Sequence, residues 1–163
     1  MREVREAFER ALADTGEIDA AIALAERFPP FGAGDPVAIA YLGSLNAMKA
    51  GHATLPWVKL RHANIASEML DHAHERRFEP AGQNEGHPAE LVILLLRGIA
   101  YASFPSFLGR GAAARESLEE AAQHPGFAQI PASYQALVHT HLAALPGARD
   151  ESCGMDALKL KGA

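Results

Sequence analysis

Apolar residues recur at helical spacing along most of the chain. They fall on one stripe in residues 2–13 and on a shorter stripe from Ile18 to Ala25. Further stripes run through about residues 36–50, 56–77, 88–103, 112–123 and 131–145. A period of three to four residues is typical of helices with one face in a core. No stretch of useful length alternates as a strand does, so the sequence predicts an all-α protein with about seven helices.

Proline, glycine and aspartate mark the ends of these segments. In the linker "FPPFGAGDP", Asp35 is placed to cap the free amides of the next helix, and Pro36 suits its first turn. We expect that helix to stop at Gly51. Pro88 is expected to open the fifth helix and Pro105 to terminate it. The polar stretch "FEPAGQNEGHP" before it predicts a long loop.

Two parts of the chain repeat one pattern. "YLGSLNAMKAG" and "LRGIAYASF" align on Gly43 and Gly98. Downstream, "ASEMLDHA" and "ARESLEEA" share a small residue, a large residue and a second small residue at helical spacing, which are Ala66, Leu70 and Ala73 in one and Ala114, Leu118 and Ala121 in the other. Small residues let two helix backbones approach, and the large residue fills the space between them.

This pattern resembles the tetratricopeptide repeat over roughly residues 37–125. The stretch "TGEIDAAIALAERFP" resembles the back half of an earlier, degenerate repeat. The resemblance implies a right-handed stack of antiparallel helix pairs. The connections from Gly43 to Ala66 and from Gly98 to Ala114 are longer than in the family. With "PWVKL" and "FPSFLGR" they are also similar to uncharacterised bacterial repeat-like proteins, from which no catalytic residue carries over.

We therefore expect residues 1–163 to form one helical-repeat domain. The first, degenerate pair would span residues 1–30, the second pair 35–77 and the third pair 88–124. Residues 131–163 would supply a capping helix and a tail. A cap is expected because the last pair of a short repeat stack would otherwise expose its apolar face.

Composition narrows the class of partner. The chain has 20 acidic and 15 basic residues, for a formal net charge of -5. A mildly acidic protein has no electrostatic reason to bind nucleic acid or an anionic membrane. No apolar run is long enough to span a bilayer, and the charged start "MREVREAFER" lacks a signal-peptide core. We expect a cytoplasmic protein, and a lone cysteine, Cys153, excludes an internal disulfide.

No motif indicates a reaction, a metal or a cofactor. The chain has no nucleophile elbow, phosphate loop or dinucleotide fingerprint. His72 and His74 are two residues apart, as are His139 and His141. On a helix such pairs point in different directions and cannot chelate one ion together. We expect a non-enzymatic protein without a metal or a cofactor.

Arg97 stands out, because it follows four apolar residues in the middle of a predicted helix. A buried guanidinium without a partner is strongly unfavourable. It would therefore be a clasp between helices, paired with Glu68, Asp71 or Glu90 or with carbonyl groups. Alternatively it would face the groove of the repeat stack and bind a carboxylate of a partner, or extend its charged end to the surface.

The other candidate binding residues lie around the same groove or in the insertions. Tyr41, Ser44 and Tyr101 belong to first helices of pairs and share the groove hypothesis with Arg97. Arg110 is expected to anchor its loop through carbonyl groups, with ligand binding as the alternative. Candidates at the start of the fourth helix are Trp57, expected to be a packing anchor unless it proves exposed, and Lys59.

The fold points to three functions. The first is a scaffold or adaptor that binds a protein or peptide in a tetratricopeptide-like groove. The second is a self-associating structural protein that forms a homodimer through the insertions 52–62 and 103–111, with Trp57, Phe104 and Phe107 exposed. The third is a small-molecule-binding protein or an enzyme with a pocket around Arg97.

Overall fold

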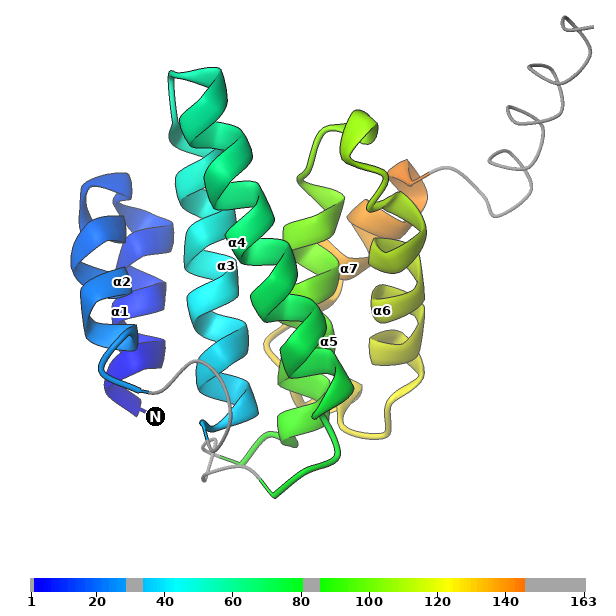
Figure 1. Cartoon of the computed structure of the whole chain (residues 1–163). Coiled ribbons are helices and arrows are strands. Elements are labelled where there is room, and N and C mark those ends of the chain that lie inside the picture. The colour runs from blue at the N-terminus through cyan, green and yellow to red at the C-terminus, as the bar shows by residue number, and fades with distance from the viewer. Residues whose placement is uncertain (1, 29–33, 81–85, 146–163) are drawn as a thin grey trace, which may run out of the picture.

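The prediction of an all-α protein with about seven helices is confirmed. The computed structural model describes residues 2–28, 34–80 and 86–145. This part of the chain contains seven α-helices and three short 3₁₀ turns and has no strand (Figure 1). The α-helices are α1 (Arg2–Ala13), α2 (Ile18–Ala25), α3 (Pro36–His52), α4 (Pro56–Glu75), α5 (Ala89–Ala102), α6 (Gly111–Gln123) and α7 (Ala132–Ala144). The 3₁₀ turns are η1 (Thr15–Glu17), η2 (Ser106–Leu108) and η3 (Phe127–Gln129).

Local chemistry sets the helix ends largely as expected. The Asp35 carboxylate accepts hydrogen bonds from the backbone N–H groups of Val37 and Ala38, at 2.8 and 3.3 Å. The expected stop at Gly51 is wrong, because α3 continues to His52 and ends where Ala53 turns extended. Gly51 stays in the helix and has no left-handed φ. The expected tail after Leu145, including Cys153, lies outside the described residues.

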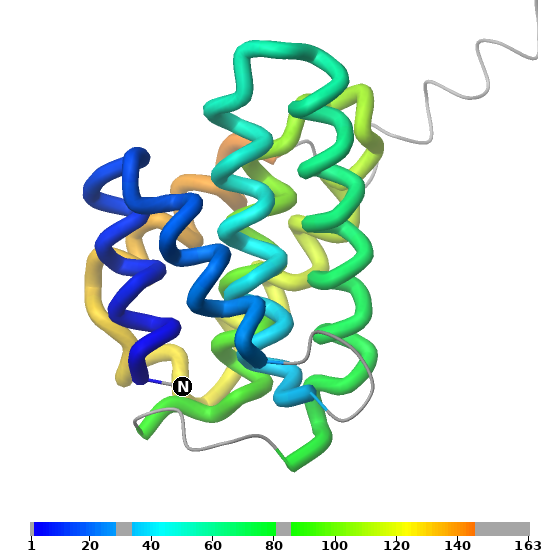
Figure 2. Tube along the Cα trace, turned by 60° about the vertical axis from the view of Figure 1, so that its left-hand side comes forward, coloured from blue at the N-terminus to red at the C-terminus, as the bar shows by residue number. Residues whose placement is uncertain are grey.

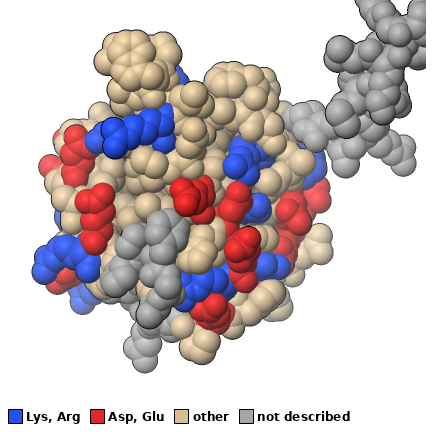
Figure 3. Space-filling model, in the orientation of Figure 1, with Lys and Arg blue, Asp and Glu red and all other residues tan. Residues whose placement is uncertain are grey.

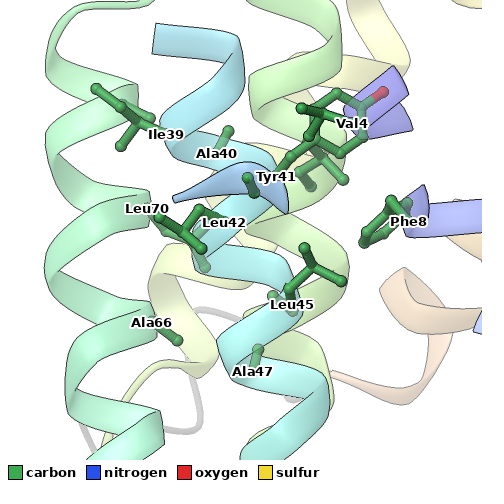
Figure 4. Close-up of a cluster of buried hydrophobic side chains, with 14 of the residues drawn as sticks. Val4, Phe8, Ile39, Ala40, Tyr41, Leu42, Leu45, Ala47, Ala66 and Leu70 are labelled. Atoms are coloured by element: carbon green, nitrogen blue, oxygen red, sulfur yellow. The ribbon is translucent and has the colours of Figure 1, made fainter. Parts of the chain in front are cut away.

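α3 is the central helix. It packs against α1, α2, α4 and α5, and its side chains are buried on nearly all sides. Figure 2 shows α1 and α2 side by side next to it. In Figure 4, Leu42 of α3 lies beside Leu70 of α4, while Phe8 of α1 points toward α3. A helix that is apolar all round needs neighbours on every side, which explains its place in the middle.

α5 connects two parts of the core. Ile93, Ala100 and Tyr101 join the buried side chains of α1–α4. Leu91 and Leu94 instead pack with residues of α6, η3 and α7, among them Leu118, Phe127 and Val138. α7 therefore covers apolar side chains of α5 and α6, as a capping helix would.

The repeated pattern describes one contact made twice. A Cβ atom on Gly43 of α3 would lie 2.8 Å from Leu70 Cγ on α4. A Cβ atom on Gly98 of α5 would lie 2.6 Å from Leu118 Cδ2 on α6. Both glycines therefore allow a leucine of the following helix to pack directly on their backbone. The alignment of Gly43 with Gly98 and of Leu70 with Leu118 is confirmed.

Gly98→Ala is expected to lower the free energy of unfolding by about 1 to 3 kcal/mol, because the new methyl group overlaps the Leu118 side chain. Gly51→Ala is the matched control, since a Cβ atom there meets nothing within 4 Å. Alanine favours the helix over glycine, so the control should gain up to about 1 kcal/mol. Urea unfolding measures both, and equal effects of the two substitutions would contradict the close contact.

Candidate functional site

Arg97 is buried in α5 and binds groups of two neighbouring helices. Its Nε and Nη2 donate hydrogen bonds to Oδ1 of Asp71 on α4, at 3.1 and 3.0 Å. Its Nη1 donates to Oγ of Ser117 on α6 at 2.6 Å and to the carbonyl oxygen of Ala113 at 3.4 Å. One guanidinium thus connects α4, α5 and α6.

The Asp71 carboxylate collects two further partners. The Tyr101 hydroxyl donates to Oδ1 at 2.8 Å and also lies 3.1 Å from the carbonyl oxygen of Ser67. Nη1 of Arg110 donates to Oδ2 at 2.9 Å. We call Asp71, Arg97, Tyr101, Arg110 and Ser117 the Asp71 cluster. Charge-assisted bonds of this kind are among the stronger hydrogen bonds in proteins.

The cluster fixes the protonation of its members. Burial alone would raise the pKa of Asp71, but hydrogen bonds from Tyr101 and Arg97 and the charges of Arg97 and Arg110 outweigh it, so the pKa falls below its ordinary value. Burial, together with the hydrogen bond to Asp71, raises the pKa of the Tyr101 hydroxyl. At neutral pH Asp71 is therefore ionised and Tyr101 keeps its proton.

The interpretation of Arg97 as a clasp between helices agrees with this geometry, and Asp71 is one of the three acids expected. The carboxylate that binds Arg97 therefore belongs to Asp71 of the same chain, where the groove hypothesis expected a carboxylate of a partner. Arg110 differs from expectation, because it binds Asp71 and not carbonyl groups of its own loop. As the residue directly before α6, it extends its side chain across to α4.

A separate cavity of about 680 Å³ lies between α1, α3, α4, α5 and α7 and the connection from α5 to α6. We call it the apolar pocket, since most of its lining is hydrocarbon. Each helix contributes a stripe at helical spacing, so that one side of each faces the cavity. The lining residues are Phe8, Leu12, Ser44, Ala47, Met48, Ala50, Gly51, His52, Pro56, Lys59, Leu60, Ala63, Leu95, Leu96, Ile99, Ala100, Ser103, Phe104, Pro105, Phe107, Leu108, Tyr134 and Leu137.

Ser44 and Lys59 are polar side chains of the lining that have no hydrogen-bond or ion-pair partner among the described residues. Ser44 is buried, and its Oγ makes no hydrogen bond in this part of the chain. Lys59 is the only lysine, arginine, aspartate or glutamate among the described residues of the lining. It is half-buried and takes part in no ion pair among residues 2–28, 34–80 and 86–145. A binding pocket commonly combines an apolar lining with a few such groups.

Exposed apolar side chains surround the apolar pocket. Four large apolar residues of the lining are exposed, and we call them the rim: Leu12, Leu60, Phe107 and Leu137. The α3–α4 turn and the connection from α5 to α6 form the two projections at the upper end of Figure 1. Figure 3 shows mostly uncharged atoms on both projections. Contiguous apolar surface on a folded protein marks an interaction site.

The structure divides the predicted candidates among different places. Ser44 and Lys59 line the apolar pocket, whereas Tyr41 lies in the core with its ring 5.2 Å from that of Phe8. The expectation that Trp57 is a packing anchor is wrong, because 68% of it is exposed. It is the second residue of α4, before the part of the helix in which Ala63, Ala66 and Leu70 are buried.

Sequence reasoning did not identify most of the apolar pocket. Leu95, Ile99 and Leu137 belong to the apolar periods of predicted helices, and periodicity does not separate a core face from a cavity face. Nor does the hypothesis of a pocket around Arg97 find support. Neither the apolar pocket nor a neighbouring cavity of about 320 Å³ is lined by a residue of the Asp71 cluster.

Three further properties bear on function: possible metal ligands, membrane-spanning helices and similarity to known proteins. No group of three His, Cys, Asp or Glu residues in the described ranges is placed to hold a metal ion. No described helix combines the length and apolar character that crossing a lipid bilayer requires. No protein-family model matches the chain, and searches of curated proteins and of solved structures give no match. The resemblance to tetratricopeptide repeats therefore depends on the repeated residues alone.

Arg97→Met is expected to lower the free energy of unfolding by about 2 to 3 kcal/mol, because it leaves the Asp71 carboxylate without its main partner. The expected loss of stability is smaller than for a fully buried ion pair, because 34% of the Asp71 side chain is exposed. Lys59→Met is the control and should change stability by less than about 0.5 kcal/mol. Thermal and urea unfolding measure both, and equal stability of Arg97→Met and the wild type would disprove the clasp.

Asp71 should also make the free energy of unfolding depend on pH. Its pKa is lowered from the ordinary 3.8, so its contribution is complete at neutral pH and is lost as pH falls below 3.8 through the folded-state pKa. The difference in unfolding free energy between wild type and Asp71→Asn should stay constant from about pH 7 to 5 and shrink below 3.8. Urea unfolding across this range measures it, and an undiminished difference in strong acid would refute the assignment.

Proposed function

We propose that this protein is a non-enzymatic adaptor that binds an apolar segment of a protein partner in the apolar pocket. The observation that carries the proposal is a cavity of about 680 Å³ that is continuous with the exposed rim. Its size falls in the range of ligand-binding pockets. The exposed rim extends the apolar surface beyond the cavity, which favours a partner larger than a small molecule.

The manner of helix stacking is part of the same proposal. We infer that α3–α4 and α5–α6 are stacked tetratricopeptide-like pairs, with α1–α2 as a degenerate first pair. The glycine–leucine contact made in both later pairs supports this. So does the lining of the apolar pocket, to which the first helix of each pair, α1, α3 and α5, contributes together with α4 and α7. In stacks of this type the first helices present the concave binding surface.

Self-association is a second candidate, and one observation favours it. Trp57 and Phe107, in the insertions 52–62 and 103–111, are 68% and 78% exposed. Large exposed aromatic side chains are enriched at protein interfaces. Phe104 is only half-buried and lies against Tyr101, at 5.7 Å between ring centroids, so it contributes less to such a surface.

The adaptor is tested by capture from a lysate of the cells that make it, with three baits compared by quantitative mass spectrometry. The baits are the wild type, the double variant Leu60→Glu/Phe107→Glu and Phe78→Glu. We expect the wild type to retain a stoichiometric protein partner and the double variant to lose at least about nine-tenths of it, which corresponds to a tenfold or greater loss of affinity, about 1.4 kcal/mol or more. A carboxylate placed in a desolvated apolar contact is strongly unfavourable.

Phe78→Glu is the matched control, because Phe78 is exposed but does not line the apolar pocket. It should retain the partner fully. Circular dichroism and melting temperature establish that all three baits are folded. Identical recovery with all three baits, or no protein enriched by the wild type, contradicts the adaptor. A wild-type dimer that the double variant converts to a monomer supports self-association instead.

A further inference from the structure

We propose that the partner segment is an amphipathic α-helix whose apolar face is bordered by acidic residues, with Lys59 pairing with one of its carboxylates. This inference rests on the proposed function and names the chemistry of the partner. Three observations support this proposal. They are the helical backbone around the apolar pocket, the charge of Lys59 in its lining, and the distribution of charge along the chain.

The lining favours a helical occupant over an extended one. An extended peptide that is buried in a cavity must pair its own backbone N–H and C=O groups with neighbouring polar groups or water. Most of the residues that line the apolar pocket lie within α-helices, whose backbone groups bond within the helix. Few polar side chains are available in their place. An α-helix satisfies its own backbone and can insert apolar side chains from one face, while the rim contacts the same face.

Lys59 calls for a negative charge on the occupant. It projects from the first turns of α4, between Pro56 and Ala63, which also line the cavity. Lys49 of the adjacent helix already pairs with Asp19, with 2.6 Å between Nζ and Oδ1. Lys59 has no such partner among the described residues. A helix that covered it without an acid would bury an unpaired ammonium group, which is costly.

The two stretches that supply most of the lining carry no acidic residue. The chain as a whole is acidic, with 20 acidic and 15 basic residues. Yet residues 36–67 and 91–115 contain lysine and arginine and no aspartate or glutamate. These two stretches supply most of the lining. The lining side chains of α7, Tyr134 and Leu137, are uncharged as well, whereas α1, which contributes Phe8 and Leu12, carries Glu9 between them.

The same charges argue against a second copy as the occupant. A two-fold dimer brings the same surface of both protomers together. In such a dimer the stretches 36–67 and 91–115 of one copy would offer lysine and arginine, and no carboxylate, to Lys59 of the other. A partner with acidic borders removes that repulsion and also gains attraction at longer range.

The test uses two synthetic helical peptides with the same leucine face and length. One carries glutamate beside this face and the other carries lysine at the same positions. Fluorescence anisotropy of the labelled peptides gives the affinities for the full chain. Emission of Trp57, the single tryptophan, gives a second readout from the first turn of α4. We expect the glutamate peptide to bind the wild type at least about tenfold more tightly at low salt, and less so at high salt.

Two variants of equal charge change separate Lys59 from the net charge of the protein. Lys59→Glu is expected to reverse the preference, so that the lysine peptide binds more tightly. Arg27→Glu is the control, because Arg27 is exposed at the end of α2 and does not line the apolar pocket. It should keep the preference of the wild type within about threefold, which is roughly the effect of remote charge alone.

The outcomes distinguish the inference from the function on which it rests. Equal binding of both peptides to the wild type, abolished in Leu60→Glu/Phe107→Glu, overturns the acidic partner and leaves the adaptor standing. Binding of neither peptide, with no partner captured from lysate, overturns both. A preference that Lys59→Glu leaves unchanged overturns the role of Lys59. Binding to vesicles of anionic phospholipid in place of either peptide, or dimerisation through this surface, overturns the helical partner.

Discussion

The carboxylate of Asp71 is the constraint on which the arrangement of the later helices depends. Arg97 is buried in α5 beside apolar side chains, and only an anion at hydrogen-bond distance makes that position tolerable. Asp71 supplies it from α4, and the Ser117 hydroxyl and Arg110 at the start of α6 complete the set. Because these bonds are directional, they fix the rotation of α5 about its own axis as well as its distance from its neighbours.

The rotation of α5 determines where the apolar pocket opens. With Arg97, Gly98 and Tyr101 directed toward α4 and α6, the stripe of Leu95 and Ile99 on another side of the helix faces the cavity. The contact of Gly98 with Leu118 then brings α6 close to α5 on the side away from the pocket. A clasp on one side and a cavity on the other are consequences of one helix orientation.

The helices and the repeated glycine–leucine contact could be predicted from the sequence, but the cavity could not. Asp35 and Pro36 predicted the start of α3 because capping depends on adjacent residues alone. The glycine–leucine alignment was predictable because it repeats within the chain. The sequence limited the acidic partner of Arg97 to three candidates, because a buried guanidinium needs an opposite charge nearby. The exposure of Trp57 and the lining by Leu95 depend on how distant helices meet, and the apolar period of a helix is the same whether a neighbour or a cavity lies beside it.

Under our proposal, stability and binding depend on different sides of the same helices, and this separation bears on how a partner would be selected. The fold leaves the rim side chains in water although burying each fully would contribute roughly 1.5 to 3 kcal/mol. A partner can recover that free energy, but apolar contacts are non-directional and discriminate poorly between partners of similar shape. Discrimination then falls to Lys59, because an unmatched charge in a desolvated contact penalises every occupant that lacks an acid at that position. Under our proposal, affinity comes from the rim and the apolar pocket, while the choice of partner comes from one lysine.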